Sequence, residues 1–180
     1  MGNNAIYGSG MNSVYEKNIV EFVTVAVEYC AFLEQTAEKS YEHFTKVVQK
    51  LLPLLYLKAS LVEKPAFMGD DDLPAAVGEI EYERVRSAIA GKLGGDDDYY
   101  NGEQGGTISE CLADIYQSLK DFVMIYKEGD QQASSDALYN CTDDFEHYWG
   151  ARLIEAMNAL HGVVYNDKTA DNESTVPAQD

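Results

Sequence analysis

Basic residues are scarce in this 180-residue chain: 13 lysines and arginines stand against 31 aspartates and glutamates, for a formal net charge of −18. No two basic residues are adjacent. The imbalance is uneven, because residues 1–66 carry 7 acids and 6 bases whereas residues 67–165 carry 20 acids and 6 bases. A surface so short of positive charge repels nucleic-acid phosphates and anionic lipid headgroups. The composition therefore argues against nucleic-acid and membrane-surface binding.

Paired cysteines and long apolar runs are also missing. The three cysteines, Cys30, Cys111 and Cys141, are odd in number and far apart, which suits reduced thiols rather than a disulfide framework. The longest apolar run, Leu51 to Leu57, is much shorter than the roughly 20 residues that span a bilayer. Residues 1–12 lack the basic and apolar regions of a signal peptide. We expect a cytoplasmic protein with no membrane segment.

Apolar residues recur at three- and four-residue spacing along most of the chain, which is typical of helices with one buried face. No segment alternates with the period of two that marks a half-buried strand. The pattern predicts an all-α, single-domain helical bundle of about five main helices and no β-sheet. We expect these helices at residues 13–38, 41–62, 79–93, 107–128 and 131–161.

Several residues are expected to mark helix ends. Ser40 can cap the second helix, and Thr107 to Glu110 form a capping box for the fourth. Glycines at positions 94, 129 and 162 are expected to end the third, fourth and last helices. The bundle domain would then span residues 13–165, between a flexible lead at residues 1–12 and a disordered polar tail at residues 166–180.

Two helices carry unusual features. Residues 41–62 are apolar on every side, which is typical of a helix in the middle of a bundle. Pro53 within them predicts a kink or a short break near Leu52. Gly150 costs the last helix about 1 kcal/mol of helix propensity, so we expect close packing or a bend there.

Two acidic loops, Asp70–Asp72 and Asp96–Asp98, raise the question of cation binding. An EF-hand that starts at Asp97 would have Tyr99 at its third position and Ile108 in place of the bidentate glutamate. The defects favour a solvated acidic loop, although weak cation binding by either loop stays open. A di-iron bundle requires two Glu-x-x-His motifs, and only residues 144–147 come near one. We therefore expect no metal site.

Catalytic motifs are not recognisable either. Glu110, Asp114, Gln117 and Asp121 share one stripe of the fourth helix, which we interpret as a solvated acidic face. Their spacing differs from the magnesium-binding carboxylates of helical nucleotide pyrophosphohydrolases. The chain has no phosphate-binding glycine motif and no Gly-x-Ser-x-Gly. We expect no catalytic residue and no cofactor, which favours a non-enzymatic protein.

Four blocks of the sequence together resemble a known family. They are VEFVTVAVEYCAFL (residues 20–33), LLPLLYLKA (51–59), TISECLADIYQSLKDF (107–122) and FEHYWGARLIEAMNALH (145–161). In this order they are similar to domain-of-unknown-function family 5063, a family of small, acidic, all-helical bacterial proteins. The likeness covers about residues 13–165. It implies an all-helical bacterial protein and carries no catalytic assignment to individual residues.

Two functional hypotheses follow, and we favour the first. It is a non-enzymatic interaction module whose acidic face and surface tyrosines contact a protein partner, or a second copy in a homodimer. The alternative is a small enzyme or ligand-binding protein with a pocket inside the bundle, near Pro53 and Trp149–Gly150. A pocket lined by Glu28 or His161, buried and with a shifted pKa, would favour the alternative. An exposed apolar and aromatic patch would favour the first.

We predict that the protein does not bind duplex DNA or RNA at physiological salt, because 31 acids oppose 13 dispersed bases. A gel-shift titration with duplexes of mixed sequence checks this. Specific binding in the sub-micromolar range would contradict the charge argument.

Overall fold

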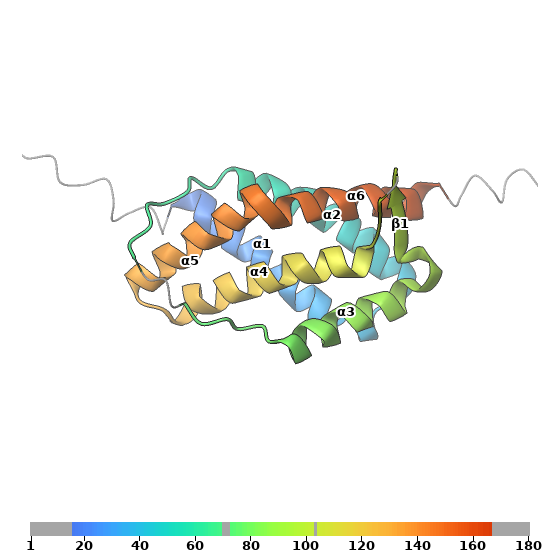
Figure 1. Ribbon diagram of the computed structural model, residues 1–180, viewed down its shortest axis with the longest axis horizontal. Coiled ribbons are helices and arrows are strands. Elements are labelled where there is room, and N and C mark those ends of the chain that lie inside the picture. The colour runs from blue at the N-terminus through green and yellow to red at the C-terminus, as the bar shows by residue number, and fades with distance from the viewer. Residues whose placement is uncertain (1–15, 70–72, 103, 167–180) are drawn as a thin grey trace, which may run out of the picture.

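Helix α4 (Ile108–Glu128) runs through the middle of the bundle, and α1, α3, α5 and α6 all pack against it (Figure 1). Every residue from Cys111 to Tyr116 is buried. Six consecutive residues cover more than one helical turn of about 3.6 residues, so no side of α4 faces solvent there. The expected all-α bundle is confirmed, with α4 at its centre.

The computed structural model describes residues 16–69, 73–102 and 104–166. The expected lead at residues 1–12 and nearly all of the expected tail lie outside these ranges. Because η4 joins α5 to α6 without a break, the described chain has the five main helices expected. The other elements are α1 (Lys17–Glu34), η2 (Thr36–Glu38), α2 (Tyr41–Ser60), α3 (Glu79–Leu93), η3 (Gly94–Asp96), β1 (Asp98–Asn101), β2 (Gln104–Thr107), α5 (Gln131–Asp144), η4 (Phe145–Trp149) and α6 (Gly150–Tyr165).

The expected caps of α2 and α4 are confirmed. Ser40 Oγ accepts a hydrogen bond from the amide of His43 at 3.2 Å, and Thr107 Oγ1 accepts one from the amide of Glu110 at 3.2 Å. Such caps satisfy amide groups that have no partner inside the helix. Helix α1 begins at Lys17, later than expected, and no side chain caps it.

A short hairpin contradicts the prediction of no β-sheet. Strands β1 and β2 pair antiparallel, with Asp98 opposite Thr107 and Asn101 opposite Gln104. Gly102 lies at the turn with a φ of +68°, a conformation that favours glycine. Four-residue strands offer too few positions for a period of two to be recognised, so the sequence pattern could not reveal them.

Helix α2 lies at the edge of the bundle, where it packs against α1 and α6, and not in the middle as expected. Leu52 and Leu55 are fully buried in the core. The helix is continuous through Pro53, so the expected break is absent. Its apolar character on every side therefore leaves leucines on the surface: Leu54, Leu57 and Leu61 are 42%, 52% and 45% exposed.

The last long helix contains one π-helical turn, η4, directly before Gly150. The Gly150 amide donates to the carbonyl oxygen of Phe145, and a Cβ at Gly150 would collide with that oxygen and lie 3.1 Å from the Phe145 ring. The expectation of close packing at Gly150 is confirmed. The helix continues past Gly162 to Tyr165, so the expected end at Gly162 is wrong.

We predict opposite effects for the two glycines of α6. Gly150→Ala should lower the free energy of unfolding by about 1–3 kcal/mol, the usual cost of an overpacked site. Gly162→Ala is the matched control, because the nearest atom to its Cβ would lie 3.6 Å away. It should be neutral or raise stability by about 0.4–1 kcal/mol. Urea denaturation of both variants measures this, and equal stabilities would contradict the role given to the π-helical turn.

Candidate functional site

Asp114, expected on a solvated stripe, is buried beneath α3 and α6 and is only 7% exposed. The Tyr82 hydroxyl donates to its Oδ1 at 2.8 Å, and Arg152 Nε lies 3.0 Å from its Oδ2. Burial and the bond to Asp114 raise the pKa of Tyr82, which keeps this hydroxyl protonated as a donor. The expectation of a solvated stripe is therefore wrong at Asp114.

The contacts of Arg152 continue toward the hairpin. Its Nη1 lies 3.4 Å from Glu155 Oε2, to which the Tyr99 hydroxyl also donates at 2.8 Å. The same hydroxyl lies 3.3 Å from the sulfur of Cys111. Burial raises the pKa of Cys111 to about 11, so the thiol stays protonated near neutral pH and is a poor nucleophile. This network of Tyr82, Asp114, Arg152, Glu155 and Tyr99 joins α3, α4, α6 and β1.

Asp121, the second aspartate of the expected stripe, holds the connection between α2 and α3 against α4. The amides of Ala76 and Val77 donate to its Oδ1 at 2.6 and 2.8 Å. Burial raises the pKa of Asp121, against the lowering effect of these two amides. Gln117 also contacts the connection, through the carbonyl oxygen of Val77 at 3.4 Å. Of the expected stripe, only Glu110 is exposed.

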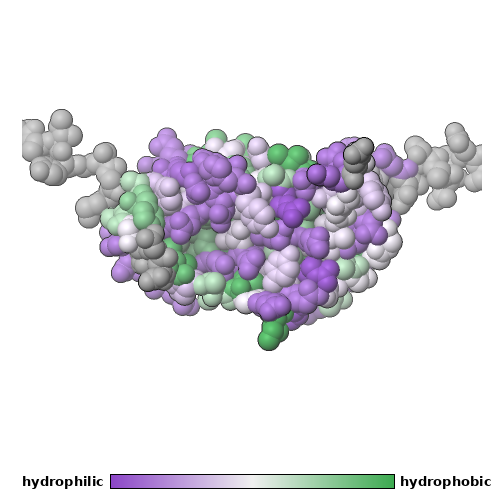
Figure 2. Space-filling model, in the orientation of Figure 1, coloured by the Kyte–Doolittle hydropathy of each residue, from purple (hydrophilic) through white to green (hydrophobic). Residues whose placement is uncertain are grey.

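Residues 73–75 bound a groove between α4 and α5, with a volume of about 350 Å³. A second hollow of about 360 Å³ adjoins it and shares Leu73, Pro74 and Ile125. Figure 2 shows this face of the molecule, which is mostly polar and has apolar surface in the recess between α4 and α5. The groove is lined by apolar Leu73, Pro74, Ala75, Phe122, Ile125, Ala137 and Cys141 and by polar Gln117, Ser118, Asp121, Asn140, Asp144 and Tyr148.

Carboxylates, and no lysine or arginine, line the groove within the described part of the chain. Asp144 stands at its rim, where partial burial and the neighbouring Asp143 raise its pKa. Tyr148 connects the groove to the network, since its ring lies 6.0 Å from Arg152 Cζ. A recess with an apolar floor and acidic edges suits a ligand that is apolar at one point and cationic at another.

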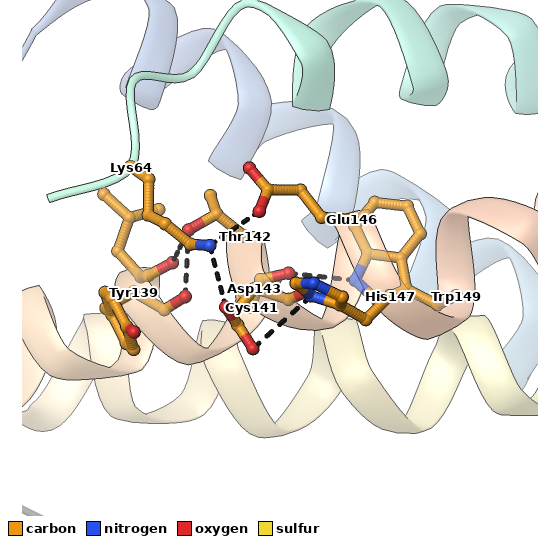
Figure 3. Close-up of polar contacts among 9 residues, drawn as sticks. Lys64, Tyr139, Cys141, Thr142, Asp143, Glu146, His147 and Trp149 are labelled. Carbon is orange, nitrogen blue, oxygen red and sulfur yellow. Dashed lines mark hydrogen bonds and ion pairs between the residues drawn. The ribbon is translucent and has the colours of Figure 1, made fainter.

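A separate cluster of possible metal ligands lies at the junction of α5 and η4 (Figure 3). Ligand atoms of Asp143, Glu146 and His147 lie within 4.8 Å of one another. However, Lys64 Nζ lies 2.7 Å from Asp143 Oδ1 and 2.6 Å from Glu146 Oε2. Its ammonium group occupies the position between the carboxylates that a metal ion would need, and it lowers the pKa of Asp143. The cluster fits an ion pair better than a metal centre.

The motif considered in the sequence, residues 144–147, is thus only partly brought together. Asp144 faces the groove, whereas Asp143, which was not singled out, meets His147: His147 Nδ1 lies 2.8 Å from the Asp143 carbonyl oxygen. Asp143 and His147 are four residues apart, an ordinary spacing for neighbours on one helix face, so the sequence could have indicated this pair.

In the acidic loop at Asp96–Asp98, two of the aspartates stabilise the fold by accepting hydrogen bonds. Asp96 accepts a hydrogen bond from the Tyr41 hydroxyl. Asp97 accepts bonds from the amide and the hydroxyl of Ser109, both at 2.7 Å, at the start of α4. The other acidic loop, Asp70–Asp72, lies outside the described residues.

The residues that would have marked an internal pocket do not form one. Glu28 and His161 are both exposed and line neither hollow. The three cysteines are buried and free, as expected. Burial raises the pKa of Cys30 to about 12 and that of Cys141 well above its ordinary value. No helix in the described ranges is both long enough and apolar enough to cross a membrane.

Comparison with known proteins identifies the family. Residues 13–166 match the family described as "Domain of unknown function (DUF5063)". The chain belongs to this family. The resemblance seen in the four sequence blocks is thereby confirmed over nearly the whole described chain.

A solved structure is also similar to this DUF5063 chain. It is the crystal structure of protein BF1032 from Bacteroides fragilis, a structural-genomics target, with 40% identity and a TM-score of 0.82. The match covers 93% of this chain and 99% of that chain. None of the curated proteins matches the chain significantly. These two matches thus support the helical-bundle fold.

We predict that Asp114→Asn lowers the free energy of unfolding by about 1–3 kcal/mol. Removing one partner of a fully buried pair costs about 3–5 kcal/mol, and less is expected here because the Arg152 side chain is 36% exposed. Glu110→Gln, an exposed position on the same helix, should change stability by less than about 0.5 kcal/mol. Urea denaturation compares the two. If both variants changed the free energy of unfolding by similarly small amounts, the result would support a solvated stripe that includes Asp114.

Proposed function

We propose that this DUF5063 protein is a non-enzymatic protein-interaction module. In this proposal the groove between α4, α5 and residues 73–75 holds a segment of a protein partner that carries an apolar side chain next to lysine or arginine. The observation that carries the proposal is the groove's apolar floor between Asp121 and Asp144, with no basic residue in the described lining.

The lining supports this chemistry at two points. Phe122 and Ile125 offer apolar surface to a partner side chain, whose burial contributes roughly 25 cal/mol per Å². The carboxylate of Asp144 has no hydrogen-bond partner among the described residues, and both amide donors of Asp121 reach Oδ1 rather than Oδ2. Both carboxylates therefore retain acceptor capacity for a cationic group. The net charge of −18 would speed the approach of a basic partner.

The raised pKa of the cysteine in the groove supports a binding role rather than thiol catalysis. Cys141, which lies in the groove wall, is buried with a pKa well above its ordinary value. Such a thiol is a poor nucleophile near neutral pH. None of the three histidines is among the described residues that line the two hollows.

One observation favours the second candidate, a small ligand-binding protein. The groove's volume of about 350 Å³ lies within the range of about 300–1,000 Å³ typical of small-molecule sites. Its acidic edges would then select a small amine. The groove lies at the surface, however, whereas the alternative expected a pocket inside the bundle.

The proposal is tested with short synthetic peptides in which leucine or phenylalanine is flanked by arginine, and with matched peptides that carry glutamate in place of arginine. We predict that the arginine peptides bind, that added salt weakens them, and that the glutamate peptides do not bind. Asp144→Lys should weaken binding on the order of tenfold, equivalent to about 1.4 kcal/mol. Fluorescence polarisation gives the affinities, and NMR shifts show whether the groove residues respond.

Glu38→Lys is the matched control. It changes the net charge by the same amount at an exposed position outside the groove, so it should leave most of the affinity. Equal weakening by both variants would mean that only overall charge attracts the peptides. Failure of every peptide, together with groove shifts caused by spermidine, would favour the small-ligand alternative instead.

A further inference from the structure

Helix α2 presents a stripe of exposed leucines on its outer side. Leu54 and Leu57 lie within the helix and Leu61 is its C-terminal cap residue; their spacings of three and four place them on one face. The opposite face of α2 packs into the core through Leu52 and Leu55, which are fully buried. The stripe is thus separate from the packing of the bundle, and α2 contributes no described residue to the groove.

The charges around this stripe differ from those of the rest of the molecule. Helix α2 carries three lysines and a single acid, Glu42. Lys46 pairs with Glu42 and Lys58 pairs with Glu21. Lys50, before the stripe, and Glu63, after it, are exposed and have no ion-pair partner among the described residues. The stripe therefore has one unpaired charge of opposite sign at each end.

We infer that the α2 stripe binds a second copy of this chain, with the two α2 helices antiparallel about a two-fold axis near Leu57. Leu54 lies three residues before Leu57 and Leu61 four residues after it, so each packs against the other in the second copy. Lys50 lies seven residues before Leu57 within α2, and Glu63 lies in the segment that follows Ser60, so each falls at the end of the stripe where the second copy presents the opposite charge. A two-fold interface requires this kind of self-complementarity.

Charge also favours a second copy on this face. Two molecules with a net charge of −18 repel each other wherever their acidic surfaces meet, and residues 67–165 carry 20 of the acids. Residues 1–66, which include α2, carry 7 acids and 6 bases and are nearly neutral. Leucine side chains allow paired helices to approach to about 8–10 Å. The α2 face therefore combines apolar surface with the least repulsion.

Sedimentation velocity and light scattering over a concentration series, at low and high salt, test the inference. The protein should form dimers that tighten as salt is added, because salt screens the repulsion between two anionic molecules. This response is opposite to that expected for peptides in the groove, so failure of one proposal is distinguishable from failure of the other. A chain that stays monomeric at every concentration and salt level overturns the inference.

Leu57→Glu should abolish dimerisation, and circular dichroism should show an unchanged helix content because glutamate is a good helix former. Ile80→Glu is the control, since Ile80 is 89% exposed on α3 and outside the stripe. Lys50→Glu should weaken the dimer on the order of tenfold, and adding Glu63→Lys should restore it. Loss of the dimer in both Leu57→Glu and Ile80→Glu, or no recovery in the double charge exchange, would show that another surface or another partner is involved.

Discussion

The structure depends on the compensation of carboxylates on the central helix α4, which is buried on every side from Cys111 to Tyr116. Helix α4 is surrounded by α1, α3, α5 and α6, so Asp114 is buried and Asp121 is half-buried. A buried carboxylate without a partner is strongly destabilising. Tyr82 and Arg152 compensate Asp114, and the amides of residues 76 and 77 compensate Asp121. The acids of α4 therefore hold α3, α6 and the α2–α3 connection in place.

The same principle extends along the α2–α3 connection. Lys64 is held by Asp143 and Glu146, and the amide of Met68 donates to the buried carboxylate of Asp136 at 2.5 Å. With Asp121, every one of these contacts ends on an acidic side chain from α4, α5 or η4. These four acids thus stabilise the fold instead of serving only as a solvated surface. The connection, in turn, bounds the groove at residues 73–75.

The two proposed surfaces follow from different uses of apolar residues. In the groove, apolar side chains from α4 and α5 lie at the bottom of a recess with acidic edges. On α2, leucines stand outward where a nearly neutral segment crosses an otherwise acidic molecule. Electrostatics favours a basic ligand at the first surface and tolerates a like-charged copy only at the second.

The sequence by itself determined the helices, the caps at Ser40 and Thr107, the buried cysteines and the close packing at Gly150, because each depends on local spacing or on the chemistry of a single residue. It also indicated the family. Tertiary structure alone decided that α4 rather than α2 is central, that Asp114 is buried and Asp121 half-buried, and that Lys64 lies between Asp143 and Glu146. The reason is physical: periodicity shows that a helix has a face, but the neighbour that covers this face comes from residues far away in the chain.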